Sequence, residues 1–338
     1  MIMRSVLYHT LPYFFSCLTL LGIFKGGIYQ FVGIVIIFLI HPLLDHFLTK
    51  LFGDHKISIE TTTNFSLYLW PLYQSLFLLL AIKSLIVEKN LFCFIAGCVS
   101  IGIITGGFGI TIAHELIHRT TKWERGLGVY ILNLVSYAPF RIEHVHGHHR
   151  NVATPFDPAT AKKGEHIYAF IPKAIVGVFK GAKKIEDSRI VRLKKSGYTF
   201  FYHRIYQYIF FTLITSIFIY LLFGFIGIFI FFFQSLVAIS LLEMVDYIEH
   251  YGLQRKMLPD GTFEPIGANH SWDTNFFLTN TSLYNLGKHA KHHQIASLPF
   301  QQLESTHGAN NYPFGYSTAV LIALYPPLWR KLVDPLIE

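Results

Sequence analysis

Long uncharged apolar runs are the feature that most constrains the fold of this chain. Residues 205–242 include no Asp, Glu, Lys or Arg, so this run of 38 residues is about twice the ~20 apolar residues that one bilayer crossing needs. Val6–Phe24 and Leu91–Ala113 are uncharged as well. Only 14% of the 338 residues are charged, against about 25% in an average soluble domain. The sequence therefore predicts an all-α, polytopic membrane protein and excludes two soluble domains.

The apolar runs predict six transmembrane helices, with Gly224 as the turn between the last two. Asp45 and Lys83 lie near the ends of two runs, and we expect both side chains to reach the membrane interface. We expect one membrane-embedded domain over residues 1–338, with a helical cap made of residues 114–204 and 246–338. The predicted spans are 6–24, 27–48, 67–87, 91–113, 205–223 and 225–245.

The distribution of basic residues predicts the orientation in the membrane. With six spans, 25 of the 28 Lys and Arg residues fall on the side that holds both termini and the cap. By the positive-inside rule that side is cytoplasmic. Residues 119–204 alone hold 16 basic and 6 acidic residues, which indicates topology and contact with anionic lipid. No nucleic-acid-binding pattern accompanies this charge.

Four groups of histidines carry the chemistry that we expect. His114 and His118, at a spacing of i, i+4, share one face of a helix. In the second group, His144 and His148 share a face, while His149 is rotated by about 100° and can serve a second ion. Nine imidazoles are too many for one tetrahedral zinc and suit two ions, although imidazole accepts Fe, Zn, Cu and Ni alike. The nine are His114, His118, His144, His148, His149, His250, His289, His292 and His293.

Other metal chemistries compete with a site for two ions. His114-Glu115-Leu-Ile-His118 matches the HExxH signature of zinc proteases, with Glu115 as the general base. A membrane protease of this kind leaves the doubled histidines at 148–149 and 292–293 unexplained. A metal transporter would need polar ligands near the bilayer midplane, where the runs are Leu, Ile and Phe. The three cysteines lie in apolar runs and form no CxxC motif.

The motifs around the histidines resemble a known family. HELIHR (114–119), EHVHGHHRNVATPFDPA (143–159), DYIEHYGLQR (246–255) and LGKHAKHH (286–293) are similar to the signatures of the membrane-bound alkane 1-monooxygenases. These are integral-membrane non-haem di-iron enzymes, and the family includes xylene monooxygenase. The HxxxH and HxxHH elements are shared with membrane fatty acid desaturases, whereas HxxxHH and VATPFDPA are more specific. His146 stands where the family usually has arginine.

The resemblance implies a function and a set of partners. It implies that the nine histidines hold two non-haem iron ions, with O2 as co-substrate, at the cytoplasmic face of a bacterial inner membrane. It implies hydroxylation of the terminal carbon of alkanes to primary alcohols, with methylarene hydroxylation or fatty acyl desaturation as alternatives. Rubredoxin or a ferredoxin-like protein would supply electrons from a separate chain, because this chain has no rubredoxin cysteine set. No catalytic residue beyond the metal ligands is implied.

Polar side chains near the histidines are expected to orient them. A carboxylate that accepts the second ring N–H of a ligating histidine fixes its tautomer. Asn269 and His270 match family positions close to the site. Gly102, Gly106, Gly107 and Gly109 either leave room for a substrate tunnel or allow close helix packing. The expected supporting residues are Glu115, Glu143, Asp157, Asp246, Glu249, Asn269, His270 and Asp273.

Overall fold

Apolar helices form one side of the fold. The computed structural model describes residues 2–53, 64–194 and 199–337. Within these residues four helical segments are long and apolar enough to cross a membrane: Gly27–Phe52, Phe65–Leu85, Leu91–Ile117 and Arg204–His250. They support an integral membrane protein, as the sequence predicts. Because helix α1 (Ile2–Lys25) is not among these four and Arg204–His250 counts as one, the number of six spans stays a prediction.

Helix α12 (Arg204–His250) turns back on itself at Gly224, where the sequence predicts a turn. Gly224 has φ 64° and ψ −161°, a conformation that glycine adopts without a steric penalty. Thr212 donates a hydrogen bond to the Asn133 side chain, while Gln234 donates to the carbonyl of Leu134. In a straight helix residues 212 and 234 would lie about 33 Å apart. Since they reach adjacent residues, the two halves of α12 run side by side.

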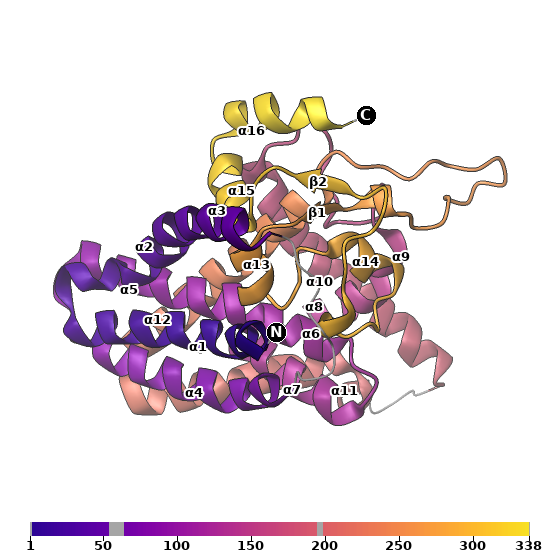
Figure 1. The fold of residues 1–338 in the computed structure, drawn as a ribbon. Helices are drawn as coiled ribbons and strands as arrows, with labels where there is room; N and C mark the ends of the chain where they lie inside the picture. Colours follow the sequence, from indigo (N-terminus) through magenta and orange to yellow (C-terminus); the bar gives the residue numbers. More distant parts are fainter. Residues whose placement is uncertain (1, 54–63, 195–198, 338) are drawn as a thin grey trace.

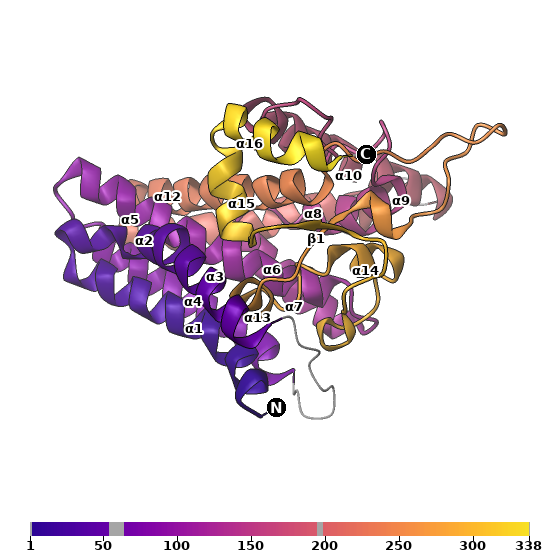
Figure 2. The ribbon, with the colours of Figure 1, turned by 45° about the horizontal axis from the view of Figure 1, so that its top comes forward.

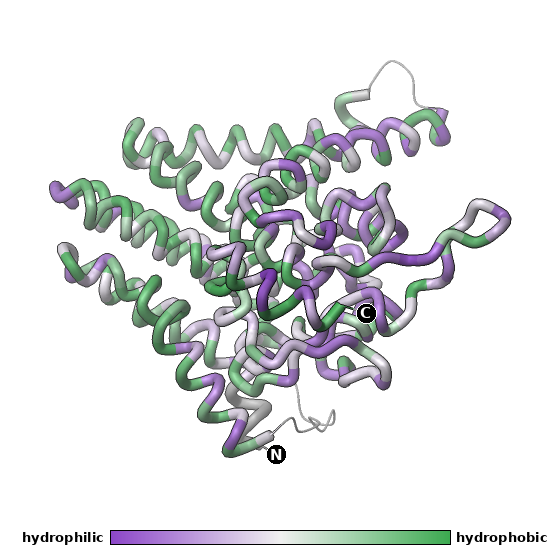
Figure 3. Tube along the Cα trace, turned by 90° about the horizontal axis from the view of Figure 1, so that it is seen from above, coloured by the Kyte–Doolittle hydropathy of each residue, from purple (hydrophilic) through white to green (hydrophobic). Residues whose placement is uncertain are grey.

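The apolar helices lie next to one another on one side of the molecule (Figures 1 and 3). Ser100 on α5 donates a hydrogen bond to the carbonyl of Gln30, which joins the third span candidate to the first. Three segments within the described residues are π-helical turns, which close i→i+5 hydrogen bonds. The elements of this side are α1, η1 (Gly27–Phe31), α2 (Val32–Val35), η2 (Ile36–Ile40, π), α3 (His41–Phe52), α4 (Phe65–Leu85), α5 (Leu91–Ile104), η4 (Thr105–Ile110, π), α6 (Thr111–Ile117) and α12.

Close packing explains most of the glycines in the Leu91–Ile117 segment. A Cβ atom at Gly102 would lie 2.5 Å from Val237, and one at Gly106 would lie 2.8 Å from the Cα of Ala238. A Cβ at Gly109 would meet the Gln74 side chain at 2.4 Å. These three glycines therefore let α4, α5 and α12 approach closely. Gly107 differs, because a Cβ there would have only Leu241 within 4 Å, at 3.8 Å.

Further helices and one small sheet form the cap on the other side (Figure 2). Strands β1 (Trp272–Thr274) and β2 (Asn310–Tyr312) pair in parallel, with Trp272 opposite Asn310. The helical elements are α7 (Lys122–Asn133), α8 (Phe140–Glu143), η5 (His144–His148, π), α9 (His149–Asn151), α10 (Ile167–Arg192), α11 (Thr199–Tyr202), η6 (Ala268–His270), α13 (Phe277–Ser282), α14 (His289–Gln294), η7 (Phe300–Gln302), α15 (Tyr316–Ala323), α16 (Pro326–Val333) and η8 (Asp334–Leu336).

Asp45 joins the cap to the apolar helices, which corrects the prediction that it reaches the interface. Its side chain is buried and accepts hydrogen bonds from the backbone N–H groups of Leu278 (2.6 Å) and Thr279 (3.1 Å). The Thr279 hydroxyl donates to it as well. These are the donors that the first turn of α13 leaves without a helical partner. Asp45 therefore caps a helix that follows it by more than 230 residues.

Candidate metal centre

The nine predicted histidines converge from four separate segments. They come from the end of α6, from η5 and α9, from the end of α12, and from α14. Within each of two groups the candidate ligand nitrogens lie within 4.8 Å of one another. We call the larger group the pentad (His114, His118, His144, His149 and His292) and the smaller the tetrad (His148, His250, His289 and His293).

The ring nitrogens of the pentad face a common centre. The Nε2 atoms of His118 and His144 lie 3.0 Å apart, and those of His144 and His149 lie 3.1 Å apart. His292 closes the group with its Nε2 atom 3.0 Å from that of His149. The Nε2 atom of His114 is buried and has no hydrogen-bond partner in the described residues. The pentad thus gathers ring nitrogens around one point, and that of His114 is left without a partner in the part of the chain described.

The tetrad repeats this geometry beside the pentad. Its Nε2 atoms are 3.2 Å apart between His148 and His293, 3.0 Å between His293 and His289, and 3.1 Å between His289 and His250. All four residues are buried. An N–H···N hydrogen bond needs a hydrogen on one of its two nitrogens. Where a ring carries its hydrogen on Nδ1, its Nε2 atom can only accept and cannot donate to a neighbouring Nε2 atom.

In the tetrad, Asp157 holds the hydrogen of His148 on Nδ1. Its carboxylate lies 2.9 Å from Nδ1 of His148 and has no exposed surface. A hydrogen on Nδ1 leaves Nε2 of His148 as a bare lone pair, and that atom faces His293. Thr160 and the N–H of Ala159 donate to the same carboxylate and hold it in place. A cation between the imidazoles satisfies these lone pairs, so the residues fit a metal ion.

Burial keeps six of the nine histidines in the neutral form that binds metal. It lowers the pKa of these six imidazoles far below the usual value near 6.5, and the neighbouring imidazoles lower it further. Neutral imidazole is the ligating form, so no proton has to leave at neutral pH before an ion binds. The six are His118, His144, His149, His289, His292 and His293.

The division of the second histidine group differs from the prediction. Sequence spacing assigned His144 and His148 to one ion and His149 to another, whereas the structure groups His144 with His149 and places His148 in the tetrad. The reason is that residues 144–148 form a π-helical turn, in which the N–H of His149 bonds to the carbonyl of His144. An i→i+5 turn brings residues five apart to one side, which α-helical spacing does not.

Two further carboxylates contact the histidine-bearing segments. Glu249 lies 3.3 Å from Nδ1 of His289, and the hydroxyl of Tyr316 donates to it at 2.8 Å. Asp273 accepts a 2.7 Å hydrogen bond from the N–H of Ala290 in the first turn of α14. Burial raises the pKa of Asp273 to about 6. Glu249 and Asp273 therefore support α14 and its three histidines.

The structure also places four other residues that were expected to support the histidines. Asp246 groups with Glu249 and His250, so three potential ligand groups meet there. Glu143 is buried next to Gly147, and burial raises its pKa well above the usual value. Nε2 of the buried His270 lies 3.2 Å from Glu264, whereas Asn269 is exposed. His146 is exposed as well and joins neither histidine group.

Glu115 is held by groups outside both histidine groups. It pairs with Arg119 at 2.6 Å and accepts a hydrogen bond from the N–H of Phe300. This arrangement argues against the zinc-protease alternative, in which Glu115 would act as a general base on water. The sequence reasoning also missed Tyr316 and Thr160, which hold Glu249 and Asp157. No local motif marks them, because their partners are distant in sequence or lie in a loop.

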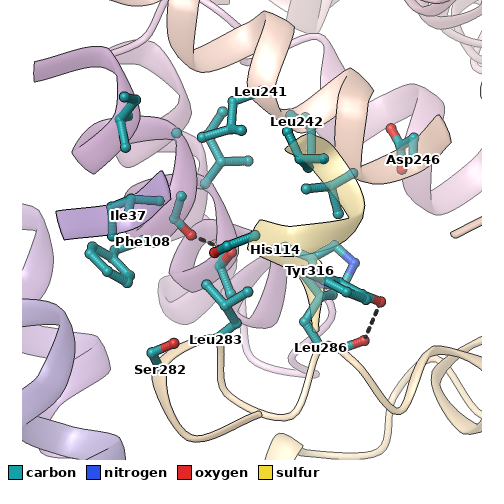
Figure 4. A pocket seen from close by; sticks show the side chains of 18 of the residues that line it. Ile37, Phe108, His114, Leu241, Leu242, Asp246, Ser282, Leu283, Leu286 and Tyr316 are labelled. Atoms are coloured by element: carbon teal, nitrogen blue, oxygen red, sulfur yellow. Dashed lines mark hydrogen bonds between the residues drawn. The ribbon is translucent and has the colours of Figure 1, made fainter. Parts of the chain in front are cut away.

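An apolar pocket leads from the apolar helices to the histidines (Figure 4). His114, His144 and His289 are among its lining residues, so the pocket reaches members of both groups. Gly106 and Gly107 also line it, which places part of the glycine-rich stretch beside the pocket. The apolar lining comes from Ile37, Phe38, Ile103, Phe108, Ile110, Phe140, Leu241, Leu242, Val245, Leu283, Leu286 and Val320.

Comparison with known proteins agrees with this geometry. The family model described as "Fatty acid desaturase" matches residues 90–319. Alkane 1-monooxygenase 2 of Pseudomonas aeruginosa is 39% identical over 239 residues, covering 70% of this chain and 62% of that protein. Alkane 1-monooxygenase 2 of Alcanivorax borkumensis is 40% identical over 240 residues, covering 71% of this chain and 63% of that protein.

A third relative matches along nearly the whole chain. The hydroxylase component of the Pseudomonas putida xylene/toluene monooxygenase is 27% identical over 336 residues, covering 98% of this chain and 88% of its own length. In contrast, the match spans less than two thirds of the length of the two alkane 1-monooxygenases. The resemblance indicated by the histidine motifs is confirmed: the chain belongs to the fatty acid desaturase family, and its relatives there include alkane 1-monooxygenases.

Proposed function

We propose that this protein is an O2-dependent membrane monooxygenase that hydroxylates the terminal carbon of alkanes or similar apolar substrates to primary alcohols. The observation that carries the proposal is the apolar pocket that ends at both histidine groups. The similarity of the chain to alkane 1-monooxygenases supports it. The reaction is R–H + O2 + 2 e⁻ + 2 H⁺ → R–OH + H2O.

The pocket would select its substrate by shape and burial. An alkane offers no polar group, so its binding depends on apolar contact, at about 0.8 kcal/mol per buried CH2. Ile37, Phe38 and Val320 line the pocket together with His114. A substrate dissolved in the bilayer would enter among the apolar helices and present a chain end to the histidines.

The pentad and the tetrad would each hold one non-haem iron ion. When bound, the two ions would supply the reduction of O2 and the oxidation of the C–H bond. The chain itself orients the ligands: Asp157 fixes His148, and Tyr316 fixes Glu249 beside His289. The apolar lining would keep bulk water away from the reacting carbon.

We further propose the setting that this reaction requires. The chain would act as a single domain in a bacterial inner membrane, with both termini and the cap in the cytoplasm. The excess of basic residues on that side supports this orientation. Two electrons per turnover would come from rubredoxin or a ferredoxin-like protein on a separate chain.

Two related reactions remain as alternatives. The relative from Pseudomonas putida favours hydroxylation of a methyl group on an arene, and the matched family model favours desaturation of a fatty acyl chain. All three reactions use an apolar substrate and the same histidine groups. They differ in product, which makes the product the decisive observation.

The test combines metal analysis with product analysis. Purified protein should contain about two irons per chain, and one zinc without iron would overturn the proposal. Cells that supply rubredoxin and its reductase are fed a medium-chain alkane, a methylarene and a saturated acyl lipid. A terminal alcohol supports alkane hydroxylation, a benzylic alcohol the arene reaction, and an alkene desaturation.

Two matched histidine variants test whether iron content and product formation both depend on the tetrad. His250→Ala removes a buried member of the tetrad, whereas His307→Ala removes an exposed histidine outside both groups. We expect loss of iron and product in the first variant and no change in the second. Equal activity of the two variants would show that the tetrad has no part in the reaction.

A further inference from the structure

Three polar side chains that belong to neither histidine group line the apolar pocket together. They are His41, Ser282 and Ser317, and we call them the polar trio. His41 is the first residue of α3, Ser282 is the last of α13, and Ser317 lies in the first turn of α15. His41 and Ser282 are buried, and Ser317 is half-buried. Three elements that are distant in the sequence therefore place polar atoms at one point of the pocket.

The polar trio lies across the pocket from the tetrad. Figure 4 shows Ser282 on the side of the pocket where Ile37 and Phe108 lie. Asp246, which groups with His250 of the tetrad, lies on the opposite side. A group held by the trio would therefore belong to a part of the bound molecule that is remote from the tetrad.

The hydrogen bonds of the trio have only one consistent direction. The Ser282 hydroxyl donates to the carbonyl oxygen of Leu278 at 2.7 Å, so it cannot donate to His41 as well. Nε2 of His41, 3.2 Å from Oγ of Ser282, therefore carries the hydrogen of that contact. In a neutral imidazole the second nitrogen is then an acceptor, so the Ser317 hydroxyl donates to Nδ1 across 3.2 Å.

This arrangement leaves oxygen lone pairs facing the pocket. The polar hydrogens of the three side chains are all used inside the protein, whereas the lone pairs of Ser317 meet no donor in the described residues. Asp45, one turn further along α3, already joins that helix to α13 and does not line the pocket. A leucine at position 41 would fill the wall without the cost of burying a polar ring. A few polar groups in an apolar pocket are typical of a site that orients a ligand.

We propose that the polar trio binds the hydroxyl group of an otherwise apolar substrate, so that the substrate class is long-chain alcohols. The inference rests on the proposed function, because it concerns the substrate of the same pocket. Oγ of Ser317 would accept the hydrogen bond, and His41 would position that oxygen by accepting the hydrogen of the serine. The alkyl chain would then follow the apolar lining and present its other end to the histidines. The reaction is HO–R–CH3 + O2 + 2 e⁻ + 2 H⁺ → HO–R–CH2OH + H2O, which yields a diol.

The direction of the hydrogen bonds predicts which polar group the trio accepts. A hydroxyl can donate a hydrogen to a serine lone pair, whereas an ether oxygen only accepts and would find no donor there. One net hydrogen bond of this kind changes affinity by about 2- to 12-fold. The trio should therefore distinguish an alcohol from an ether of the same size.

Binding measured without an electron donor tests the trio independently of turnover. The protein is placed in nanodiscs, and its affinity is measured for three unbranched probes of equal chain length: undecane, decan-1-ol and 1-methoxynonane. The alcohol and the ether are isomers and differ in whether the oxygen carries a hydrogen. Each affinity is corrected for partition of the probe into empty nanodiscs. We expect the parent to bind the alcohol on the order of tenfold more tightly than the alkane or the ether.

Variants of the trio should remove this preference. The trio variant is His41→Leu with Ser317→Ala, and the control is His9→Leu with Ser66→Ala. His9 and Ser66 form another histidine–serine pair, 2.5 Å apart between Nδ1 and Oγ, which does not line the pocket. We expect the trio variant to bind the alkane like the parent and the alcohol no more tightly than the alkane. Ser317→Ala alone should also lose the preference while the buried imidazole stays in place.

Four outcomes bear on the proposal. Equal affinity of the parent for the alcohol and the alkane would overturn it, and so would an ether that binds as tightly as the alcohol. Equal loss of the preference in the trio variant and the control would overturn it as well. With electrons supplied, the parent should convert decan-1-ol to the α,ω-diol, whereas an aldehyde as the main product would place the hydroxyl at the histidines and refute the proposal. If no probe is oxidised while the alcohol is still preferred, the proposed function fails and the binding of the hydroxyl stands.

Discussion

Two adjacent glycines allow packing and pocket shape to be tested separately. Gly106 and Gly107 both lie in the π-helical turn η4 and both line the pocket. A Cβ at Gly106 would lie 2.8 Å from Cα and 2.9 Å from the carbonyl oxygen of Ala238, both backbone atoms of α12. A Cβ at Gly107 would have only the Leu241 side chain near it, at 3.8 Å, which is ordinary contact.

The two Gly→Ala substitutions should therefore have opposite effects on stability. Gly106→Ala forces η4 and α12 apart by several tenths of an ångström, and overpacking of this kind costs about 1–3 kcal/mol. Gly107→Ala fits its space and gains about 0.5–1 kcal/mol from the lower entropy of the unfolded chain. The variants should differ by about 1.5–4 kcal/mol in the free energy of unfolding.

Thermal unfolding in detergent, followed by tryptophan fluorescence, measures this difference. We expect Gly106→Ala to melt several degrees below the parent and Gly107→Ala at or slightly above it. Gly107→Val adds a test of the pocket, because its methyl groups would occupy space in the pocket near Leu241 and shift the preference to shorter or thinner substrates. Equal melting temperatures for the two alanine variants would refute the proposed contact between η4 and α12.

Three further predictions concern the metal centre and the cap. Asp157→Asn removes the charge that holds His148, so metal affinity should fall by about 10–100-fold in a chelator competition, with no change in helix content by circular dichroism. Glu186→Gln weakens the contacts to Arg189 and Arg204 and should lower stability by on the order of 2 kcal/mol at pH 7. Despite burial, these arginines lower the pKa of Glu186 to about 2, below its unfolded value near 4.3. The stability that the Glu186 carboxylate adds is therefore present above pH 4.3 and is lost as the pH falls toward 2. The melting curves of the parent and the variant should converge at that low pH. Removing bound metal with a chelator should lower the melting temperature by several degrees, and adding ferrous iron back without oxygen should restore it.

The sequence was most informative where a pattern is local. The i, i+4 spacing of His114 and His118 brings both rings to the pentad, because α-helical geometry holds there. The same spacing places His289 and His293 together in the tetrad and leaves His292 for the pentad. Uncharged apolar runs likewise located the membrane-spanning candidates to within a few residues at most ends.

Such local patterns could not predict contacts between segments that are distant in the sequence. Asp45 looked like an interfacial charge because its partners, Leu278 and Thr279, follow it by more than 230 residues. Tyr316 holds Glu249 from a helix that carries no polar motif. In both cases the burial of a polar group is offset by a hydrogen bond that only the tertiary fold supplies.

The three π-helical turns within the described residues connect the fold to the metal centre. Each of them borders the pocket: η2 through Ile37 and Phe38, η4 through Gly106 and Gly107, and η5 through His144. A π turn widens the helix and shifts the side chains that follow it relative to α-helical register. In η5 this shift sends two adjacent histidines to different groups. Because nothing in the residue spacing signals a π turn, the number of imidazoles can be counted from the sequence, but their assignment to two centres follows from the backbone.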